Sequence, residues 1–208
     1  MKILICDDHK IVRDGLRQIL QQLSELTYIG DAMDGKEALR LLKEDEYDVL
    51  LLDISLPDQN GLEVLKSVKA KWPSVNVLML SMLPQEQYAI RALKLGASGY
   101  LTKDTAAEEL ILAIKKVSEG GKYISQSLAE NIALHLDDDV LHQKHETLSN
   151  REFEIMIKIA NGKSLQEIGD ELFISVKTVS TYRCRIMEKM GLKKNTDLTR
   201  YCLENKLI

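Results

Sequence analysis

The sequence predicts an α/β fold, with a doubly wound, five-stranded parallel sheet followed by a small all-α domain of four helices. Up to about Gly121, short apolar runs alternate with amphipathic segments of helix length, which is the pattern of repeated βα units. Three of these runs are apolar without alternation, as expected for strands that helices cover on both faces. After Gly121 no strand-like run follows and only helical periodicity remains, so the 208 residues divide into two parts.

Five apolar runs are predicted as strands, and five βα units make a sheet of flavodoxin type. The runs cover residues 2–6, 28–32, 49–53, 77–80 and 99–101. Between them, apolar residues recur at helical spacing, as in the segment 12–23. The last helix of this part is predicted to begin with a capping box at Thr105 and Glu108 and to end at Gly120 and Gly121.

Four helices are predicted in the second part, because each has a polar residue with capping geometry at its start. These start signals are Ser149, Ser164, Ser175 and either Asn195 or Thr196. Gly162 and Gly191 are predicted stops. A tight turn at residues 172–174 joins the second and third helices, which predicts helix-turn-helix geometry.

Three segments follow from these changes of pattern. They are an α/β domain at 1–121, a linker at 122–146 that is partly helical over 126–136, and a helical domain at 147–208. Residues 1–125 carry 16 Lys and Arg against 19 Asp and Glu, residues 126–146 carry 1 against 5, and residues 147–208 carry 11 against 8. A mildly basic domain behind an acidic linker, centred on Asp137-Asp138-Asp139, indicates a nucleic-acid partner.

The composition is typical of a folded protein, with 45% hydrophobic and 29% charged residues, and excludes a disordered chain or a disulfide scaffold. No stretch approaches the ~20 apolar residues of a membrane span, and the first residues lack the apolar core of a secretory signal. The three cysteines, Cys6, Cys184 and Cys202, are expected to be reduced. A cytoplasmic protein without a membrane partner is therefore expected.

Polar residues follow the predicted strands at one edge of the sheet. Asp7 and Asp8 follow the first strand, and Asp53 ends the third. Ser81 and Lys103 follow the fourth and the fifth. Because the carboxyl ends of parallel strands meet at one edge, these side chains are expected to converge there. Three carboxylates with one lysine favour a hard divalent cation such as Mg²⁺, although any single acid at a loop start is more often a turn former or a helix cap.

These residues, with Pro57, Gly61 and Tyr100, resemble the receiver domain of bacterial two-component response regulators. The second part is similar to the LuxR-type helix-turn-helix, through Leu148-Ser149-Asn150-Arg151-Glu152, Gly162-Lys163-Ser164, Glu167-Ile168 and Ser175-Val176-Lys177-Thr178-Val179. The order of the two motif sets is similar to that of the NarL/FixJ family. Proline often follows the receiver lysine, whereas Asp104 stands here.

The resemblance implies a role for each receiver residue. Asp53 would accept a phosphoryl group from the phosphohistidine of a sensor histidine kinase. Mg²⁺ would be held by Asp7, Asp8, Asp53 and the backbone carbonyl of Ser55. Lys103 would pair with a phosphate oxygen, Ser81 would donate a hydrogen bond to the phosphate, and Tyr100 would swing inward as the switch residue.

The third helix of the second part, residues 175–190, is long enough to lie in a major groove of double-stranded DNA. Val179, Ile186 and Met190 form one stripe and are expected to pack against the other helices. The candidate DNA-binding residues lie on the remaining surface and before the second helix. They are Lys163, Ser164, Lys177, Thr178, Ser180, Thr181, Tyr182, Arg183, Cys184, Arg185 and Lys189.

These features predict a DNA-binding transcription regulator whose phosphorylation at Asp53 frees the DNA-binding domain and promotes a homodimer. The alternative is a regulator whose receiver works as a phosphorylation-independent interaction module. A phosphohydrolase is disfavoured because Ser55 stands where such enzymes carry a second acid, so no enzyme activity beyond its own phosphoryl transfer and autodephosphorylation is expected. The apolar face of the last helix, 195–205, fits dimerisation and simple core packing equally well.

The histidines have simpler interpretations than catalysis or metal binding. His9, at the start of a helix, fits a structural or solvated imidazole. His135, His142 and His145 lack the spacing of a zinc site and lie in the predicted linker.

Overall fold

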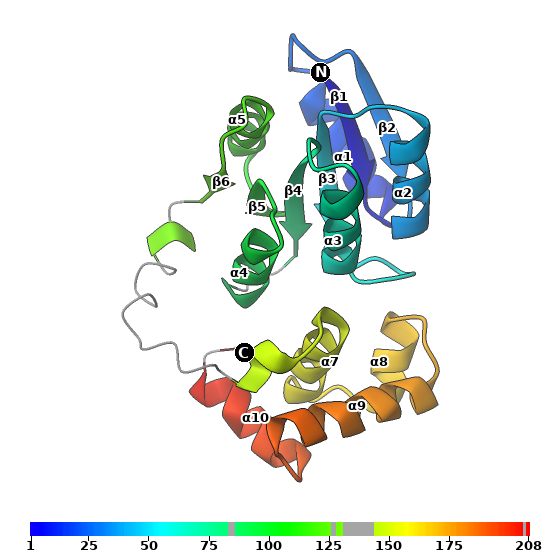
Figure 1. Ribbon diagram of the computed structural model, residues 1–208, viewed down its shortest axis with the longest axis vertical. Coiled ribbons are helices and arrows are strands. Elements are labelled where there is room, and N and C mark those ends of the chain that lie inside the picture. Colours follow the sequence, from blue (N-terminus) through cyan, green and yellow to red (C-terminus); the bar gives the residue numbers. More distant parts are fainter. Residues whose placement is uncertain (83–85, 126–127, 131–143, 206) are drawn as a thin grey trace. The chain divides into compact units, whose positions relative to one another are not determined.

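The computed structural model describes residues 1–82, 86–125, 128–130, 144–205 and 207–208 (Figure 1). The chain divides into two compact units, Met1–Asp137 and Asp138–Ile208. The first unit is a parallel sheet covered by helices and the second is helical, which confirms the predicted fold class. Within the part of the chain that is described, no helix has the length and apolar character needed to cross a membrane.

The sheet has six parallel strands in the order β2-β1-β3-β4-β5-β6, not the predicted five. The strands are β1 (Lys2–Cys6), β2 (Tyr28–Ala32), β3 (Val49–Asp53), β4 (Asn76–Ser81), β5 (Gly99–Thr102) and β6 (Tyr123–Ile124). The five predicted runs are all strands. The sixth has two residues, too few to produce a periodic signal, and it pairs Tyr123 with Gly99. A Cβ atom at Gly99 would lie 2.5 Å from the Tyr123 carbonyl oxygen, so the absence of a side chain permits this pairing.

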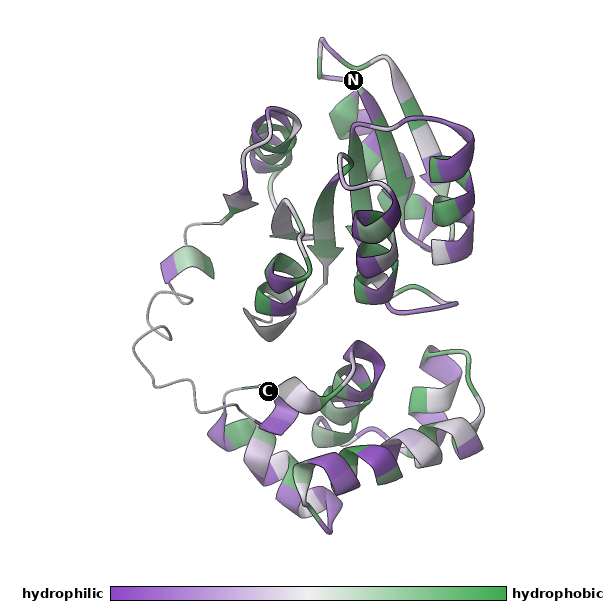
Figure 2. Ribbon diagram, in the orientation of Figure 1, coloured by the Kyte–Doolittle hydropathy of each residue, from purple (hydrophilic) through white to green (hydrophobic). Residues whose placement is uncertain are grey.

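Five helices cover the two faces of the sheet (Figure 1). They are α1 (Lys10–Leu20), α2 (Gly35–Glu44), α3 (Gly61–Lys71), α4 (Glu86–Lys94) and α5 (Ala107–Ser118). Helices α1 and α5 share one face, and α2, α3 and α4 share the other. On the first face, alternate strand residues such as Ile5 and Leu51 pack against Leu20 and Ile114. The strands are the most hydrophobic part of this unit, and each helix has one hydrophobic face (Figure 2).

The predicted capping box of α5 is wrong. The N-cap is Ala106, without a side-chain hydrogen bond. The Thr105 hydroxyl instead lies 3.1 Å from the Thr102 hydroxyl, one residue before the cap position. The helix therefore starts one residue later than the spacing of Thr105 and Glu108 predicted.

The helical unit contains the 3₁₀ helix η1 (Lys144–Thr147) and α7 (Asn150–Ala160), α8 (Leu165–Glu171), α9 (Val176–Met190) and α10 (Asn195–Glu204). Ser149 and Ser164 form the predicted capping boxes, and Ser175 accepts a hydrogen bond from the Thr178 amide. Gly191 ends α9 at φ 67°, in the left-handed region. In the predicted linker, residues 128–130 are helical, whereas 126–127 and 131–136 of the predicted helical segment lie outside the described residues.

The turn between α8 and α9 has an unusual backbone conformation and a close backbone approach. Phe173 has φ 52°, a left-handed conformation that non-glycine residues rarely adopt. A Cβ atom at Gly169 would lie 2.8 Å from the Ile174 carbonyl oxygen, so the backbones approach too closely for a side chain there. The Arg151 guanidinium donates a hydrogen bond of 3.0 Å to the Leu172 carbonyl and thereby caps the end of α8. These contacts give the predicted helix-turn-helix.

Replacement of two helical glycines by alanine is expected to change stability in opposite directions. Gly169→Ala forces a backbone shift in the turn and should lower the free energy of unfolding of its unit by about 1–2 kcal/mol. Gly15→Ala in α1 meets no atom within 4 Å and should raise it by about 0.5–1 kcal/mol. Denaturant unfolding of both variants tests this, and stabilisation by Gly169→Ala would contradict the close approach.

Candidate phosphorylation and DNA-binding sites

Residues from three strand ends converge at the carboxyl edge of the sheet. Asp7 follows β1, Asp53 ends β3, and Lys103 follows β5. The Lys103 ammonium lies 2.6 Å from Asp7 Oδ2 and 2.7 Å from Asp53 Oδ2. Both carboxylates are buried, and so is the lysine side chain. The structure therefore joins two of the predicted acids through the predicted lysine.

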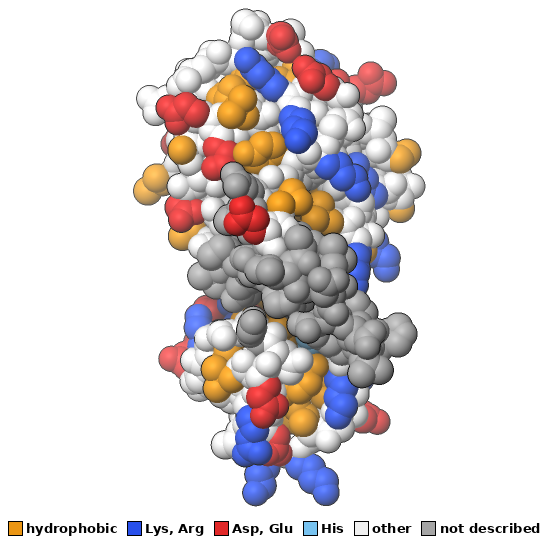
Figure 3. Space-filling model, turned by 90° about the vertical axis from the view of Figure 1, so that its left-hand side faces the viewer, with side chains coloured by type: hydrophobic (Ala, Val, Ile, Leu, Met, Phe, Trp, Pro, Cys, Tyr) orange, Lys and Arg blue, Asp and Glu red, His pale blue; other side chains and the backbone are white. Residues whose placement is uncertain are grey.

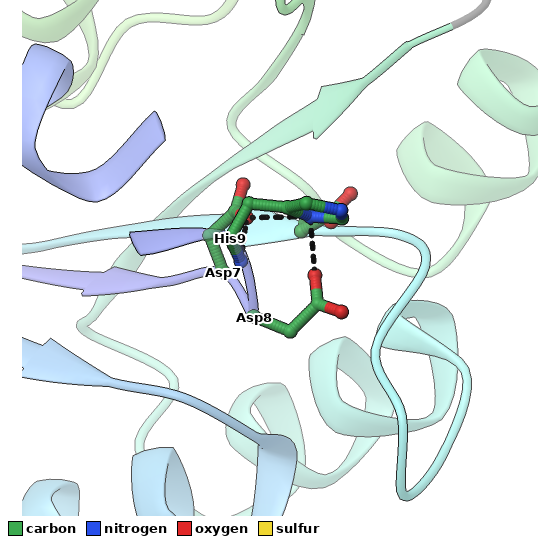
Figure 4. A group of neighbouring side chains, drawn as sticks. Asp7, Asp8 and His9 are labelled. Atoms are coloured by element: carbon green, nitrogen blue, oxygen red, sulfur yellow. Dashed lines mark hydrogen bonds and ion pairs between the residues drawn. The ribbon is translucent and has the colours of Figure 1, made fainter. Parts of the chain in front are cut away.

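Asp7, Asp8 and His9 lie together at the end of β1 (Figure 4). The His9 amide donates a hydrogen bond of 2.9 Å to Asp7 Oδ1, and its ring Nδ1 lies 2.6 Å from Asp8 Oδ1. The imidazole is 66% exposed. The Arg13 guanidinium, to which the sequence assigned no structural role, donates a hydrogen bond of 2.6 Å to the Asp7 carbonyl and fixes this turn.

The acidic group has a composition that suits Mg²⁺. Potential ligand atoms of Asp7, Asp8, His9 and Asp53 all lie within 4.8 Å of one another. Carboxylate oxygens are the hard ligands that magnesium prefers, and a small acidic cluster leaves room for its water molecules. The residues present therefore fit the ion, and the acidic cluster is typical of a receiver magnesium site.

Burial and charge shift the proton affinities of this group. Burial raises the pKa of Asp53 to about 6, from an ordinary value of 3.8, although the Lys103 charge and its hydrogen bond oppose the change. Burial alone would lower the pKa of Lys103, but the Asp53 and Asp7 carboxylates raise it by more. The lysine therefore stays charged between the two acids.

Ser81 and Tyr100 lie on the neighbouring strands β4 and β5. The Tyr100 side chain is 3% exposed, so it occupies an inward position. Burial raises its pKa to about 12, an effect that a hydrogen bond with Ser81 opposes. The Ser81 carbonyl also accepts a hydrogen bond of 2.7 Å from the Lys103 amide. The predicted hydroxyl, aromatic and lysine thus form one connected group.

The segment after β3, residues 54–60, surrounds Asp53. The Ser55 amide donates a hydrogen bond of 3.2 Å to Asp53 Oδ1. Asn60 caps α3 by accepting a bond from the Leu62 amide. A Cβ atom at Gly61 would lie only 2.0 Å from the Asp53 carbonyl oxygen, so only glycine allows this return of the chain.

Helix α9 presents the candidate DNA-binding surface of the helical unit. Val179, Ile186 and Met190 are buried, as predicted. A shallow hollow of about 270 Å³ lies on the opposite side, lined by Lys177, Thr178, Thr181, Tyr182 and Arg185. Lys177, Thr181, Cys184, Arg185 and Lys189 are exposed, and Thr178, Ser180, Tyr182 and Arg183 are partly exposed. On the face seen in Figure 3, Lys and Arg side chains project from the lower end of this unit.

Several candidate DNA-binding residues form ion pairs or hydrogen bonds within the helical unit. Lys189 Nζ lies 2.6 Å from Glu152 Oε2, and Arg183 Nε donates 2.7 Å to Asn195 Oδ1. Lys163 pairs with Glu171, and Ser164 is the N-cap of α8. The Ser164 cap was predicted from the sequence, whereas the partners of Lys189 and Arg183 were missed because they lie on other helices.

His145 has a structural role in the helical unit. Its side chain is buried, its Nδ1 lies 3.0 Å from the Tyr201 hydroxyl, and its ring lies 5.8 Å from that of Phe153. His135 and His142 lie outside the described residues.

Comparisons with known proteins match both units. The response regulator receiver domain matches residues 3–115, and the luxR family of bacterial regulatory proteins matches residues 146–202. The oxygen regulatory protein NreC of Staphylococcus haemolyticus is 35% identical over 215 residues, which cover 100% of this chain and 99% of NreC. The response regulator GacA of Pseudomonas aeruginosa is 34% identical over 209 residues, with 100% and 98% coverage.

Two solved structures of RcsB from Salmonella are similar over 97% of this chain and 97% of RcsB. One RcsB structure has 27% identity and a TM-score of 0.62. Another, bound to the promoter rprA with the phosphomimetic BeF₃⁻, has 26% identity and a TM-score of 0.66. The chain therefore belongs to the two-component response regulators that combine a receiver with a LuxR-type helix-turn-helix. Within that class it is a DNA-binding regulator of the NarL family, similar to NreC, GacA and RcsB, and not a conventional enzyme.

The raised pKa of Asp53 predicts a specific pH dependence of stability. Because the folded state holds this proton more tightly than the unfolded state, the Asp53 contribution lowers stability as pH rises from about 4 to about 6. Asparagine does not titrate, so the stability of Asp53→Asn relative to wild type should grow by about 2–4 kcal/mol over that range. Urea unfolding with EDTA at a series of pH values measures this difference. A difference that stays constant from pH 4 to 7 would show that Asp53 has an ordinary pKa.

Proposed function

We propose that this transcription regulator is switched by phosphoryl transfer from a sensor histidine kinase to Asp53. The observation that carries this proposal is the buried Asp53 carboxylate, held by Lys103 beside Asp7. In the transfer, the N–P bond of a phosphohistidine breaks as an O–P bond forms at an Asp53 carboxylate oxygen. The cytoplasm, where such kinases present their phosphohistidine, is the proposed location.

The receiver residues each supply one part of this reaction. Lys103 provides a fixed positive charge for the phosphoryl oxygens, in a site where burial strengthens electrostatic interactions. Asp7, Asp8, Asp53 and the Ser55 carbonyl would hold Mg²⁺, which neutralises charge on the phosphoryl group when bound. Ser81 would donate a hydrogen bond to the phosphate. Because Ser81 also bonds Tyr100, this change would be transmitted to β5.

For DNA binding, we propose that α9 enters the major groove. Its outer surface offers hydroxyls, cations and one thiol, from Lys177, Thr178, Ser180, Thr181, Tyr182, Cys184 and Arg185, with Arg183 and Lys189 beside them. Lys163 and Ser164, at the start of α8, would contact phosphates. RcsB is described in complex with DNA, as two dimers on two parallel DNAs, which supports this assignment by similarity.

We propose that the switch acts between two domains, residues 1–121 and 147–208, which the linker 122–146 joins. Phosphorylation would free α9 and promote a homodimer. Asp137-Asp138-Asp139, suggested above as part of the acidic linker, lie outside the described residues. In α10, Leu198 and Cys202 are fully buried in the core of the helical unit, which supports the packing interpretation of that face.

Incubation with acetyl phosphate and Mg²⁺ is expected to add one phosphoryl group to the wild type and none to Asp53→Asn. Intact-mass spectrometry measures this, with EDTA as the metal-free control. Beryllofluoride binding provides a second readout, because some receivers accept phosphate only from their kinase. Failure of both would favour the phosphorylation-independent interaction module instead.

Substitutions on α9 should separate contacts to DNA from contacts within the unit. Lys177 and Arg185 line the exposed hollow. Lys177→Ala and Arg185→Ala should therefore each weaken binding to a duplex selected from random sequence by roughly 10-fold or more. Lys189→Ala should weaken it less and reduce stability, because Lys189 pairs with Glu152. Fluorescence anisotropy at fixed salt measures the affinities. Equal losses for all three variants would contradict the proposed orientation of α9.

A further inference from the structure

The segment 54–60, which follows the phosphoacceptor strand, reaches across to the N-terminus of α2. Asp58 Oδ1 accepts a hydrogen bond of 3.0 Å from the Gly35 amide, and Asp58 Oδ2 accepts one of 3.0 Å from the Lys36 amide. The N-cap residue Asp34 accepts 2.8 Å from the Glu37 amide. Two carboxylates, one local and one from the distant segment, therefore satisfy the first three amides of α2.

This contact is closely packed as well as hydrogen-bonded. A Cβ atom at Gly35 would lie 2.5 Å from Gln59 Nε2 and 2.6 Å from Val64 Cγ2. The start of α2 and the tip of the segment 54–60 thus approach as closely as a glycine allows. Asp58 holds two elements that lie 23 residues apart in the sequence.

The base of the same segment is fixed beside Asp53. The Gly61 amide donates 2.8 Å to the Ile54 carbonyl, and Ser55 forms an antiparallel bridge with Asn60. A segment fixed at its base and held at its tip by Asp58 has little freedom to move. The Asp58 contact therefore adds a second anchor, at the tip, to the segment that carries Ser55.

The N-terminus of α2 is in turn connected to the other half of the acidic site. The Asp34 carbonyl oxygen lies 3.5 Å from the thiol of Cys6, the residue that precedes Asp7. The Asp7 amide donates 3.2 Å to the Ala32 carbonyl at the end of β2. Through α2, Asp58 thus connects the segment that carries Ser55 with the strand end that carries Asp7.

We propose that Asp58 is a positioning residue that fixes the distance between the Ser55 carbonyl and the Asp7 and Asp8 carboxylates, and so sets the magnesium affinity of the receiver. This inference rests on the proposed magnesium site. Asp58 is not itself a ligand in this arrangement, because its two oxygens accept the Gly35 and Lys36 amides. It acts by orienting a ligand, as outer-sphere residues of metal sites do.

Asp58→Ala and Asp34→Ala form a matched pair for the test, since each removes one carboxylate from the same helix N-terminus. Both are expected to lower the Tm of the full chain by a similar amount, roughly 3–6 °C. Only Asp58→Ala should raise the Mg²⁺ dissociation constant, by about 3- to 10-fold, as measured by NMR titration with MgCl₂. Without metal, only Asp58→Ala should speed amide exchange in residues 54–60, by about 10-fold.

The outcomes distinguish this inference from the proposed function. No Mg²⁺ binding by the wild type would contradict the magnesium site and this inference with it. Wild-type binding with equal dissociation constants for the two variants, or unchanged exchange in 54–60, would overturn the role of Asp58 alone. If Asp58→Ala does not fold, Asp58→Asn provides the same comparison, because its single amide oxygen can still accept one of the two bonds.

Discussion

The receiver depends on one buried contact, the Lys103 ammonium between the carboxylates of Asp7 and Asp53. Without this cation, burial and the nearby Asp7 charge would raise the pKa of Asp53 further. The strand order places β1 beside β3, so the two acids end neighbouring strands, whereas Lys103 follows β5 on the other side of β4. With β4 between them, β3 and β5 lie about 10 Å apart, a distance that the long side chain of Lys103 helps to span. The order of the strands therefore brings the three charged side chains together.

The same lysine connects the acidic site to Ser81 and Tyr100 on the neighbouring strands β4 and β5. Its amide bonds the Ser81 carbonyl, and the Ser81 side chain bonds Tyr100. A change of charge at Asp53 alters the environment of Lys103 and of the hydroxyl beside it at once. In the proposed switch, this geometry allows a local electrostatic event to move a buried aromatic without a change in the sheet.

The sequence predicted the parts of the fold that depend on local pattern. Apolar runs ending in Asp or Ser located β1, β3 and β4, and serines with capping spacing located α7, α8 and α9. The remainder depends on contacts between distant segments. β6 exists because Gly99 admits a neighbouring backbone, and Asp58 accepts hydrogen bonds from amides that lie 22 and 23 residues away. The capping box predicted at Thr105 was wrong because the Thr105 hydroxyl bonds the Thr102 hydroxyl instead. The periodicity of apolar residues along the sequence does not reveal such contacts.

The charge distribution of the helical unit constrains how it can bind DNA. Residues 147–208 have an excess of only three positive charges, and Lys158, Lys163 and Lys189 form ion pairs with Glu171 or Glu152. Few cations remain for phosphates, and each phosphate contact contributes a salt-dependent increment of affinity. One unit alone therefore has weak non-specific attraction to DNA. Two units on neighbouring half-sites would double the contacts without raising the affinity of the isolated unit, which is consistent with the homodimer proposed above.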